Sequence, residues 1–174
     1  FRLNSKSHNT LTVNDRLQQV DGFAEITALS SQTHMPHTII DLSSVYSDQL
    51  ARVRRGIGLW NNRIVVIQDE MTARKDSTRV RWSMLPRAAV TLNGSGAELE
   101  QNGRSVRLKI IQPADAEFSI YPSDPPPADY DARNPGTRIL GFEKELESSA
   151  PHRFLVLLIP ADDPVPTIQP LSAW

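Results

Sequence analysis

Short segments in which apolar and polar residues alternate, or in which β-branched residues cluster, recur along almost the whole chain. Residues 11–13, 23–29 and 38–42 are of this kind, and turn-forming residues bound each of them. Alternation over a few residues is the pattern of a half-buried β-strand, because successive side chains of a strand point to opposite faces of its sheet. The pattern predicts strands from one end of the chain to the other.

The strongest signal is a pair of long predicted strands, residues 51–60 and 63–71. Asn61 and Asn62 lie between them, and asparagine tolerates the left-handed backbone that a two-residue hairpin turn requires. The same rhythm then continues, with Asn-Gly and other turn signals between further predicted strands at 78–85, 88–92, 97–100, 105–111, 117–121, 138–145 and 153–159.

No part of the sequence carries an apolar stripe at the helical period, so helices are not expected. Many short strands in one chain bury their apolar faces against each other, either in two stacked antiparallel sheets or in a barrel. We predict an all-β fold, a two-layer antiparallel β-sandwich of about a dozen strands. The length of 174 residues fits a single domain spanning residues 1–174.

Residues 121–136 interrupt this rhythm. They contain five prolines, and proline has no backbone N–H to donate to a strand ladder. We therefore expect an extended surface loop here.

The charge balance and the lack of cysteine exclude several kinds of partner and site. A formal net charge of -1 and a pI near 6.5 give no overall attraction to nucleic acid or to an anionic membrane, so we expect neither as a partner. Without cysteine, the chain has no disulfides, thiolate metal sites or cysteine nucleophiles. Its longest apolar run, residues 154–160, is too short to span a membrane.

Phosphate-binding, serine-hydrolase, zincin and EF-hand motifs do not occur in the sequence. Histidines and scattered charges remain as candidates. His34 and His37 have the His-x-x-His spacing of a metal pair, but Pro36 between them favours a turn with exposed side chains. His152 opens a predicted strand and is expected at the surface.

Arg52 and Arg54 alternate with Val53 in the centre of a predicted strand. Two interpretations remain open. The arginines either lie on the solvated face of that strand or bind an acidic sugar, which makes them candidate substrate-binding residues.

His8 stands at the entrance to the first predicted strand and is followed by Asn9 and Thr10. A side chain in this position reaches over the edge of a sheet, where an imidazole suits proton transfer or zinc binding. A single histidine near a chain end is also commonly exposed without a role. The residues alone leave both interpretations open.

The segment around His8 and several later segments fit one family pattern in order and spacing. The residues concerned are 1–15 with Arg2 and His8-Asn9-Thr10, Gln18 or Gln19, Tyr46, Arg52-Val53-Arg54-Arg55, the hairpin of residues 59–69, Val80-Arg81-Trp82, and Leu92-Asn93-Gly94. Together they resemble the carboxy-terminal β-sandwich of the heparinase II/III-like polysaccharide lyases. The resemblance covers nearly the whole chain, and the His-Asn-Thr motif with its flanking arginine is its most specific part.

Members of that family join an amino-terminal α/α toroid to this β-domain and cleave uronic-acid polysaccharides by β-elimination. The reaction needs neutralisation of the C5 carboxylate, a base for the C5 proton and an acid for the leaving O4. The resemblance implies an acidic polysaccharide as partner, whether heparan-type, alginate-type or another uronate. It also implies a periplasmic or secreted location.

In that family the β-domain also holds a zinc ion, through two histidines and an aspartate. By motif position, His8 resembles the last of these ligands and not the catalytic histidine. The partner ligands and the toroid would precede Phe1. The resemblance therefore implies a fragment of a longer chain, with no complete catalytic set, that alone is inactive and retains little zinc.

Two other functions stay open beside the lyase domain. A carbohydrate-binding β-sandwich would expose aromatic platforms, for which Tyr130 and Trp174 are the best candidates. A purely structural domain that supports the toroid would carry a large apolar patch on one sheet face.

Overall fold

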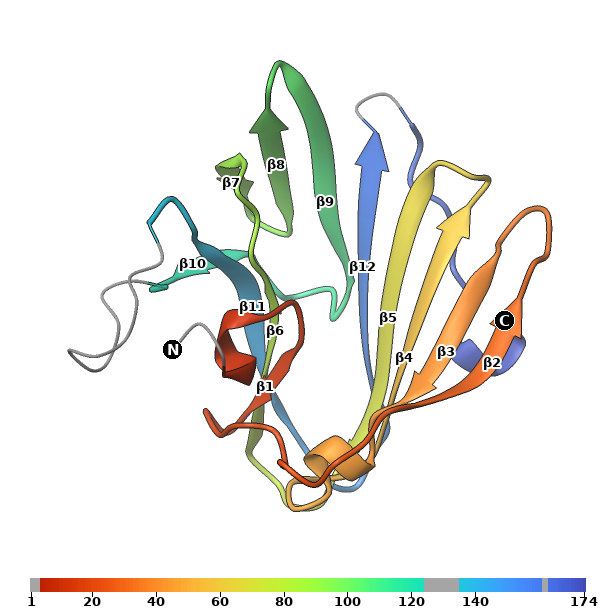
Figure 1. The fold of residues 1–174 in the computed structure, drawn as a ribbon, viewed down its shortest axis with the longest axis vertical. Coiled ribbons are helices and arrows are strands. Elements are labelled where there is room, and N and C mark those ends of the chain that lie inside the picture. Colours follow the sequence, from red (N-terminus) through yellow and green to blue (C-terminus); the bar gives the residue numbers. More distant parts are fainter. Residues whose placement is uncertain (1–3, 124–134, 161–162) are drawn as a thin grey trace.

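The computed structural model describes residues 4–123, 135–160 and 163–174. These residues form two antiparallel β-sheets stacked as a sandwich (Figure 1). Within these ranges no helix has the length and apolar character needed to cross a membrane. The predicted all-β sandwich is therefore confirmed.

One sheet has four strands and the other has eight. The four-stranded sheet has the order β1 (Leu11–Val13), β6 (Thr78–Met84), β11 (Ile139–Leu146) and β10 (Ser119–Tyr121). The eight-stranded sheet has the order β2 (Glu25–Ser30), β3 (His37–Asp41), β4 (Leu50–Trp60), β5 (Ile64–Ala73), β12 (His152–Pro160), β9 (Arg104–Gln112), β8 (Gly96–Gln101) and β7 (Ala89–Asn93). Three short 3-10 turns complete the elements: η1 (Ser5–Ser7), η2 (Ser44–Tyr46) and η3 (Leu171–Ala173).

Each predicted strand is present, because the alternation of apolar residues and the turn signals agree along the chain. Asn102 and Gly103 both have a left-handed backbone, with φ of 54° and 71°, between the paired residues Gln101 and Arg104. The predicted proline-rich loop begins one residue late, since Tyr121 still pairs in the ladder of β10 with β11. Residues 124–134 of that loop lie outside the described residues.

The long hairpin of β4 and β5 differs from its prediction in one respect. Asn61 and Asn62 have the expected left-handed backbone, with φ of 48° and 57°. However, Trp60 pairs with Ile64, so the loop holds three residues and includes Arg63. The extra residue shifts the pairing of the two strands by one position, which decides which charged side chains face each other.

The core lies between the sheets. The face of the eight-stranded sheet that carries Val53 and Val156, called here the inner face, packs against the four-stranded sheet. Aromatic rings bridge the two layers: Trp82 and Phe142 stack with centroids 5.9 Å apart, and Phe142 contacts Phe154 of the opposite sheet at 5.0 Å. Such ring pairs add to the stabilisation that comes from burying their area.

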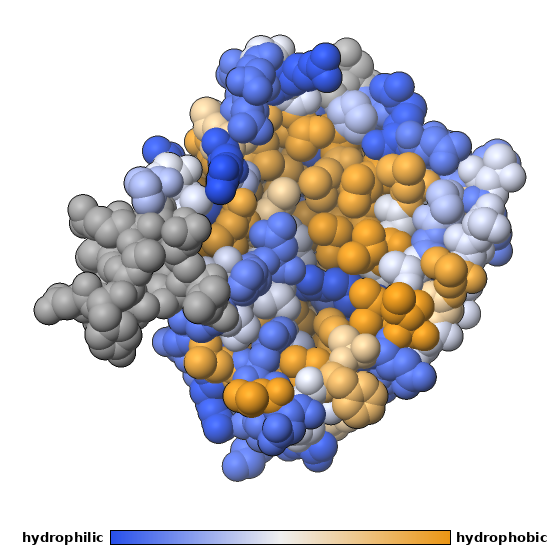
Figure 2. Space-filling model, viewed as in Figure 1, coloured by the Kyte–Doolittle hydropathy of each residue, from blue (hydrophilic) through white to orange (hydrophobic). Residues whose placement is uncertain are grey.

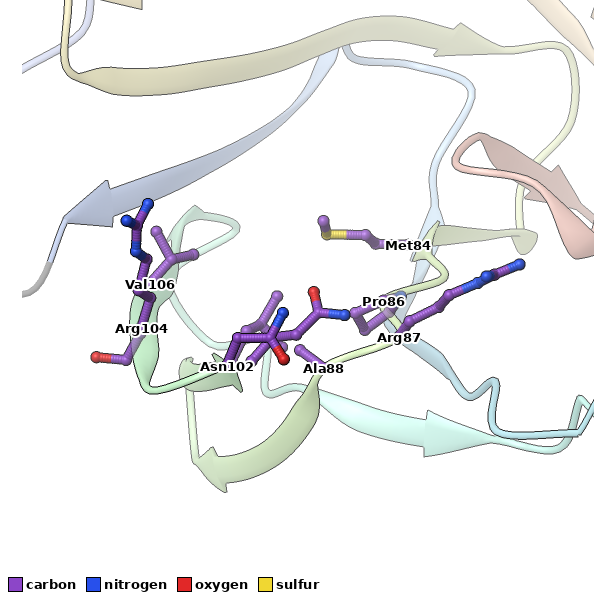
Figure 3. Close-up of a pocket in the computed structure, with 10 residues that line it drawn as sticks. Met84, Pro86, Arg87, Ala88, Asn102, Arg104 and Val106 are labelled. Carbon is purple, nitrogen blue, oxygen red and sulfur yellow. The ribbon is translucent and has the colours of Figure 1, made fainter.

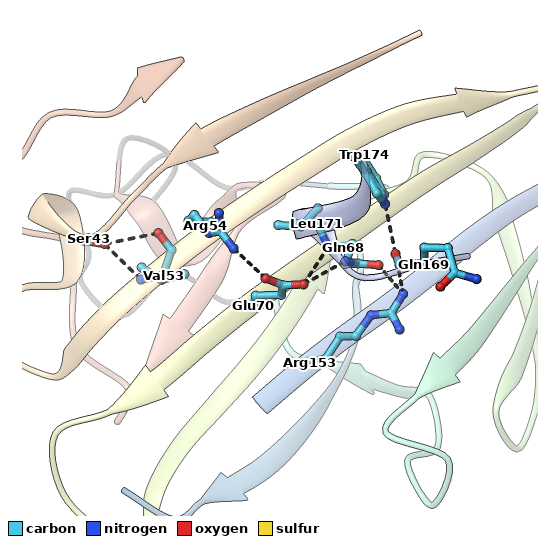
Figure 4. Close-up of polar contacts among 9 residues, drawn as sticks. All are labelled: Ser43, Val53, Arg54, Gln68, Glu70, Arg153, Gln169, Leu171 and Trp174. Atoms are coloured by element: carbon cyan, nitrogen blue, oxygen red, sulfur yellow. Dashed lines mark hydrogen bonds and ion pairs between the residues drawn. The ribbon is translucent and has the colours of Figure 1, made fainter. Parts of the chain in front are cut away.

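The opposite face of the eight-stranded sheet, called here the outer face, is covered by the C-terminal segment, residues 163–174. Glu70 accepts a hydrogen bond from the backbone N–H of Leu171 at 2.7 Å, and Arg153 donates to the carbonyl oxygen of Gln169 (Figure 4). Arg153 also donates to the carbonyl oxygen of Ile168. Ile168 joins a second apolar cluster with β5 and β12 on this face. The segment is thus fixed by both polar and apolar contacts.

Gly56 of β4 makes room for this segment, because a side chain at that position would overlap Leu171 and Trp174. We expect the Gly56→Ala variant to fold and to displace the segment, since the overlapping atoms belong to the side chains of Leu171 and Trp174 and not to strand backbone. Trp174 fluorescence should shift towards the value of exposed indole. Gly96→Ala in the distant strand β8 is the control, because the added carbon would come no closer than 3.3 Å to any atom. An unchanged Trp174 signal in Gly56→Ala would contradict this account.

The inner face extends beyond the four-stranded sheet that packs on it. Figure 2 shows apolar surface gathered over the eight-stranded sheet in its upper half, rimmed by polar residues. Ile57 is 39% exposed and Leu29, at the sheet edge, is 82% exposed. One sheet face therefore presents a large apolar area.

Candidate functional site

The candidate site is the His8 loop, residues 8–10, which joins η1 to β1. Asn4 caps η1, because its side-chain oxygen accepts a hydrogen bond from the backbone N–H of Lys6 at 3.0 Å. The carbonyl oxygen of His8 then accepts a hydrogen bond from Thr10 N–H at 2.9 Å. The side chains of His8 and Asn9 are exposed. The backbone of the loop is therefore ordered while its imidazole faces solvent.

A buried ion pair of β4 and β5 lies beneath this loop. Arg55 donates two hydrogen bonds to the carboxylate of Asp69, at 2.7 and 3.0 Å, and a third to the carbonyl oxygen of Asn9 at 3.0 Å. Burial alone lowers the pKa of an arginine, but the charge and hydrogen bonds of Asp69 outweigh it and raise the pKa of Arg55 above its usual value. The pair is charged, and it anchors the loop to the eight-stranded sheet.

Tyr46, at the end of η2, holds the other end of the loop. Its hydroxyl donates to the carbonyl oxygen of Leu11 at 2.9 Å, contacts the hydroxyl of Thr10 at 3.0 Å, and accepts from the amide of Gln18 at 2.7 Å. Gln18 also donates to Thr10. Burial raises the pKa of Tyr46 above its usual value, and the hydrogen bonds offset this only in part. Tyr46 is neutral and serves as a hydrogen-bonding hub.

Leu85, the residue that follows β6, supplies another contact. The side-chain oxygen of Asn9 accepts a hydrogen bond from the backbone N–H of Leu85 at 2.8 Å. Both sheets, η2 and the segment around Gln18 thus converge on three residues. A histidine supported in this way presents its ring from a fixed backbone, as ligands held by surrounding hydrogen bonds do.

The described residues hold no cluster of three histidines, cysteines or acidic residues that suits a metal ion. His8 is accessible to a metal from solvent, but a zinc site needs at least three protein ligands. A zinc ion at His8 would therefore need donors from outside the described residues.

Arg52 and Arg54 lie on the other side of the sheet from the His8 loop. Both point to the outer face, since they pair with Thr72 and Glu70, whereas Arg55 points inwards. Arg54 forms an ion pair with Glu70 at 2.8 Å, and Arg52 is exposed. Only Arg52 thus occupies a solvated position, because Glu70, the partner of Arg54, also binds the C-terminal segment. Neither arginine lies beside His8.

The remaining histidines, His34, His37 and His152, differ in burial. His37 was expected to be exposed, but it is 7% exposed, with Nδ1 at 2.8 Å from the carbonyl oxygen of Met35 and its ring edge-on to Trp174. It is buried because the C-terminal segment folds over it, which sequence spacing does not reveal. His34 is exposed. His152 is half-buried, and its Nε2 lies 2.8 Å from the carbonyl oxygen of Glu147.

Of the two expected aromatic platforms, Trp174 is half-buried. The Trp174 ring packs over Gly58, and its N–H donates to the carbonyl oxygen of Gln169 at 3.0 Å. Tyr130 lies outside the described residues. The structure therefore offers no support for a sugar platform at Trp174.

Two hollows lie away from these candidates. A groove of about 800 Å³ runs between the end of β6 and the β8–β9 hairpin, over Met84, Leu99 and Val106 (Figure 3). Arg87 and Arg104 rim it, and Figure 3 shows their guanidinium groups pointing away from each other. A polar hollow of about 210 Å³ is lined by Thr12, Asp15, Arg79, Arg81 and Glu143. Neither lining includes His8, Arg52 or Arg54.

Sequence reasoning identified His8 but gave no role to the groups that hold it. Arg55, Asp69 and Tyr46 were noted only as parts of a pattern. The signal that reveals the Arg55–Asp69 pair is the register of the β4–β5 hairpin, which sets these residues opposite each other. The contact of Tyr46 with Thr10 joins residues 36 positions apart and has no local signal.

Neither a protein-family model nor a curated protein matches this sequence. The fold does match solved structures. Heparan sulfate lyase HepC from Pedobacter heparinus matches with a TM-score of 0.71 over 90% of this chain and 24% of its own, at 10% identity. A heparinase III with methylated lysines matches with a TM-score of 0.72 over 92% of this chain and 24% of its own, at 16% identity. Another heparinase III matches with a TM-score of 0.71 over 90% of this chain and 24% of its own, at 13% identity.

At these identities the similarity establishes a shared fold. The chain spans about a quarter of the length of the matched structures.

Proposed function

We propose that this chain is the carboxy-terminal β-sandwich domain of a polysaccharide lyase that cleaves uronic-acid-containing polysaccharide by β-elimination. In this role the domain supports a catalytic toroid and closes one side of the substrate cleft. Its partners are then an acidic polysaccharide and the toroid, and the parent enzyme is periplasmic or secreted. The support for the proposal is structural and comes from the His8 loop within a fold shared with heparan-degrading lyases.

The observation that carries the proposal is the agreement between motif and contacts. The residues that resemble the lyase family in sequence include Thr10, Gln18, Tyr46, Arg55 and Asp69. In the folded chain they form two groups of hydrogen bonds, Thr10 with Gln18 and Tyr46, and Arg55 with Asp69, and both groups contact the His8 loop. A set of dispersed residues that fixes the backbone beside one exposed imidazole supports a functional position for His8.

The role proposed for His8 is that of a zinc ligand in the parent protein. An exposed imidazole on a fixed loop fits one position of such a site, and donors outside the described residues would complete it. Zinc there would provide structural support. Neutralisation of the C5 carboxylate and the two proton transfers would then rest on groups of the toroid and its cleft. Arg52 and Arg54 remain candidates for contacts with the acidic substrate.

The first test is a lyase assay with heparan-type and alginate-type polysaccharides, followed by the absorbance of the unsaturated uronate product. We expect residues 1–174 alone to give no product, because in this proposal the base and the acid of the β-elimination belong to the toroid and its cleft. A longer parent protein that contains this domain should be active. Its His8→Ala variant should bind less zinc, measured by metal analysis of the purified protein, whereas His34→Ala should bind as much as wild type.

Either of two results would overturn the proposal. Lyase activity from residues 1–174 alone would mean that the domain carries its own catalytic groups. A parent protein without activity on any uronate polysaccharide would remove the lyase assignment itself.

A purely structural function is the second candidate, and the apolar inner face favours it. A domain that only supports a neighbour needs a large apolar contact area and no catalytic or ligand-binding group. In that case the His8→Ala parent would keep both its activity and its zinc content.

A further inference from the structure

The segment that leads into β2, together with β2 itself, exposes large apolar side chains at every third position. Five of the nine exposed large apolar residues among those described lie between residues 17 and 29: Leu17 at 52%, Val20 at 97%, Phe23 at 67%, Ile26 at 64% and Leu29 at 82%. Single exposed apolar residues need no explanation, but five of them within residues 17–29 indicate an interaction surface. We call it the apolar row.

The apolar row ends on a sheet edge. β2 pairs with β3 on one side and, among the described residues, has no strand on the other. Edge strands are usually blunted by charged side chains, by proline, by bulges or by a covering segment. β2 has the sequence Glu-Ile-Thr-Ala-Leu-Ser, with one charge at its first position, no lysine or proline, and one register irregularity between Ile26 and Ala28. Its free backbone groups are therefore open to pairing with another strand.

An irregularity in β2 places its two large apolar residues on the same face. The register shifts between Ile26 and Ala28, so Ile26 pairs with Ile40 while Leu29 pairs with Thr38. Because Thr38 and Ile40 are two residues apart, Ile26 and Leu29 share a face. Thr38 in turn pairs with Ile57, so this is the inner face, and the edge continues its exposed apolar area.

We propose that β2 pairs antiparallel with β2 of a second copy of this chain, around a two-fold axis. Ile26 and Leu29 of one copy then lie against the same residues of the other, and the two inner faces form one continuous apolar surface. Such an interface is self-complementary, as an isologous dimer requires. The proposal goes beyond the lyase role and does not depend on it.

The charges of β2 favour this partner. Glu25 is the only charged residue of the strand and lies at its first position. Antiparallel pairing carries the two Glu25 side chains to opposite ends of the paired strands, so that they do not repel each other. The other edge of the same sheet, β7, offers no equivalent surface. Leu92 is its one large exposed apolar residue, at 40%. Pairing through β2 therefore uses the one suitable edge of each copy, and assembly stops at a dimer.

The test is sedimentation velocity and light scattering of wild type over a wide concentration range. We expect a concentration-dependent species of twice the 19.4 kDa chain mass. Leu29→Lys should raise its dissociation constant at least tenfold. Leu92→Lys, on the opposite edge, is the matched control and should leave the dissociation constant unchanged. Hydrogen exchange of the amides of residues 25–30 should slow as wild type dimerises.

The following outcomes would overturn the proposal. Wild type is monomeric at every concentration, or forms open-ended aggregates, or dimerises equally well in Leu29→Lys. Dimerisation without slower exchange in residues 25–30 would also reject pairing through β2. None of these results bears on lyase activity, so this proposal and the proposed function can fail separately.

Discussion

The Asp69→Asn variant is expected to lose about 3–5 kcal/mol of unfolding free energy, the cost of removing one partner of a buried ion pair. Asparagine keeps the shape of the side chain but not its charge, so the Arg55 guanidinium stays buried without a counter-charge. Urea unfolding at neutral pH measures the loss. The anchor of Arg55 on Asn9 is expected to weaken as well, which faster proteolysis near residues 8–10 would report.

A second ion pair of the same geometry provides the control. Arg63 donates to both oxygens of Asp163, at 2.7 and 3.1 Å, but its side chain is 61% exposed. Because water screens such a pair, Asp163→Asn should leave the urea midpoint nearly unchanged. If Asp69→Asn and Asp163→Asn lost equal unfolding free energy, burial would not be the reason that the Arg55–Asp69 pair stabilises the fold.

The Gly141→Ala variant is expected to lose about 3 kcal/mol or more, at the upper end of the cost of overpacking. Gly141 lies in β11 and pairs with Ser83 of β6. A side chain at this position would overlap the carbonyl oxygen of Trp82 and would lie 3.4 Å from Cα of Ser83. Both obstacles are backbone, so no change of rotamer relieves them, and β6 and β11 must move apart.

Thermal unfolding followed by near-UV circular dichroism measures this loss, because Trp82 and Phe142 stack beside the strained pair. Gly96→Ala is the matched control in a strand. Its added carbon would meet the carbonyl oxygen of Asn93 at 3.3 Å, and we expect stability within about 1 kcal/mol of wild type. A Gly141→Ala protein as stable as Gly96→Ala would show that the two strands have room to separate.

The β4–β5 hairpin shows how far sequence alone reaches. The asparagines predict the turn, since their left-handed backbone is a local property. A two-residue turn, however, would have set Arg54 opposite Asp69 and Arg55 opposite Gln68. Arg63 enters the loop instead, and Arg55 meets Asp69. Local propensity selects the turn residues, while the packing of both strand faces selects the register.

The candidate site divides in the same way. His8 is identifiable because its short motif is local, whereas the groups that hold it come from η2, β4 and β5. Arg52 and Arg54 drew attention as an alternating row, yet their neighbour Arg55 faces the loop. One step along a strand reverses the face, so a row of charges does not reveal which member points inwards.

The sequence by itself determined the fold class and the place of each strand, because apolar alternation and turn residues are local signals that agree along the chain. It also determined His8 as the candidate residue. Only the tertiary structure decided that Arg55 and Asp69 anchor the His8 loop, that Trp174 of the C-terminal segment packs against His37, and that the apolar row stays exposed. These outcomes depend on which distant segments meet, and that is set by burial across the whole molecule.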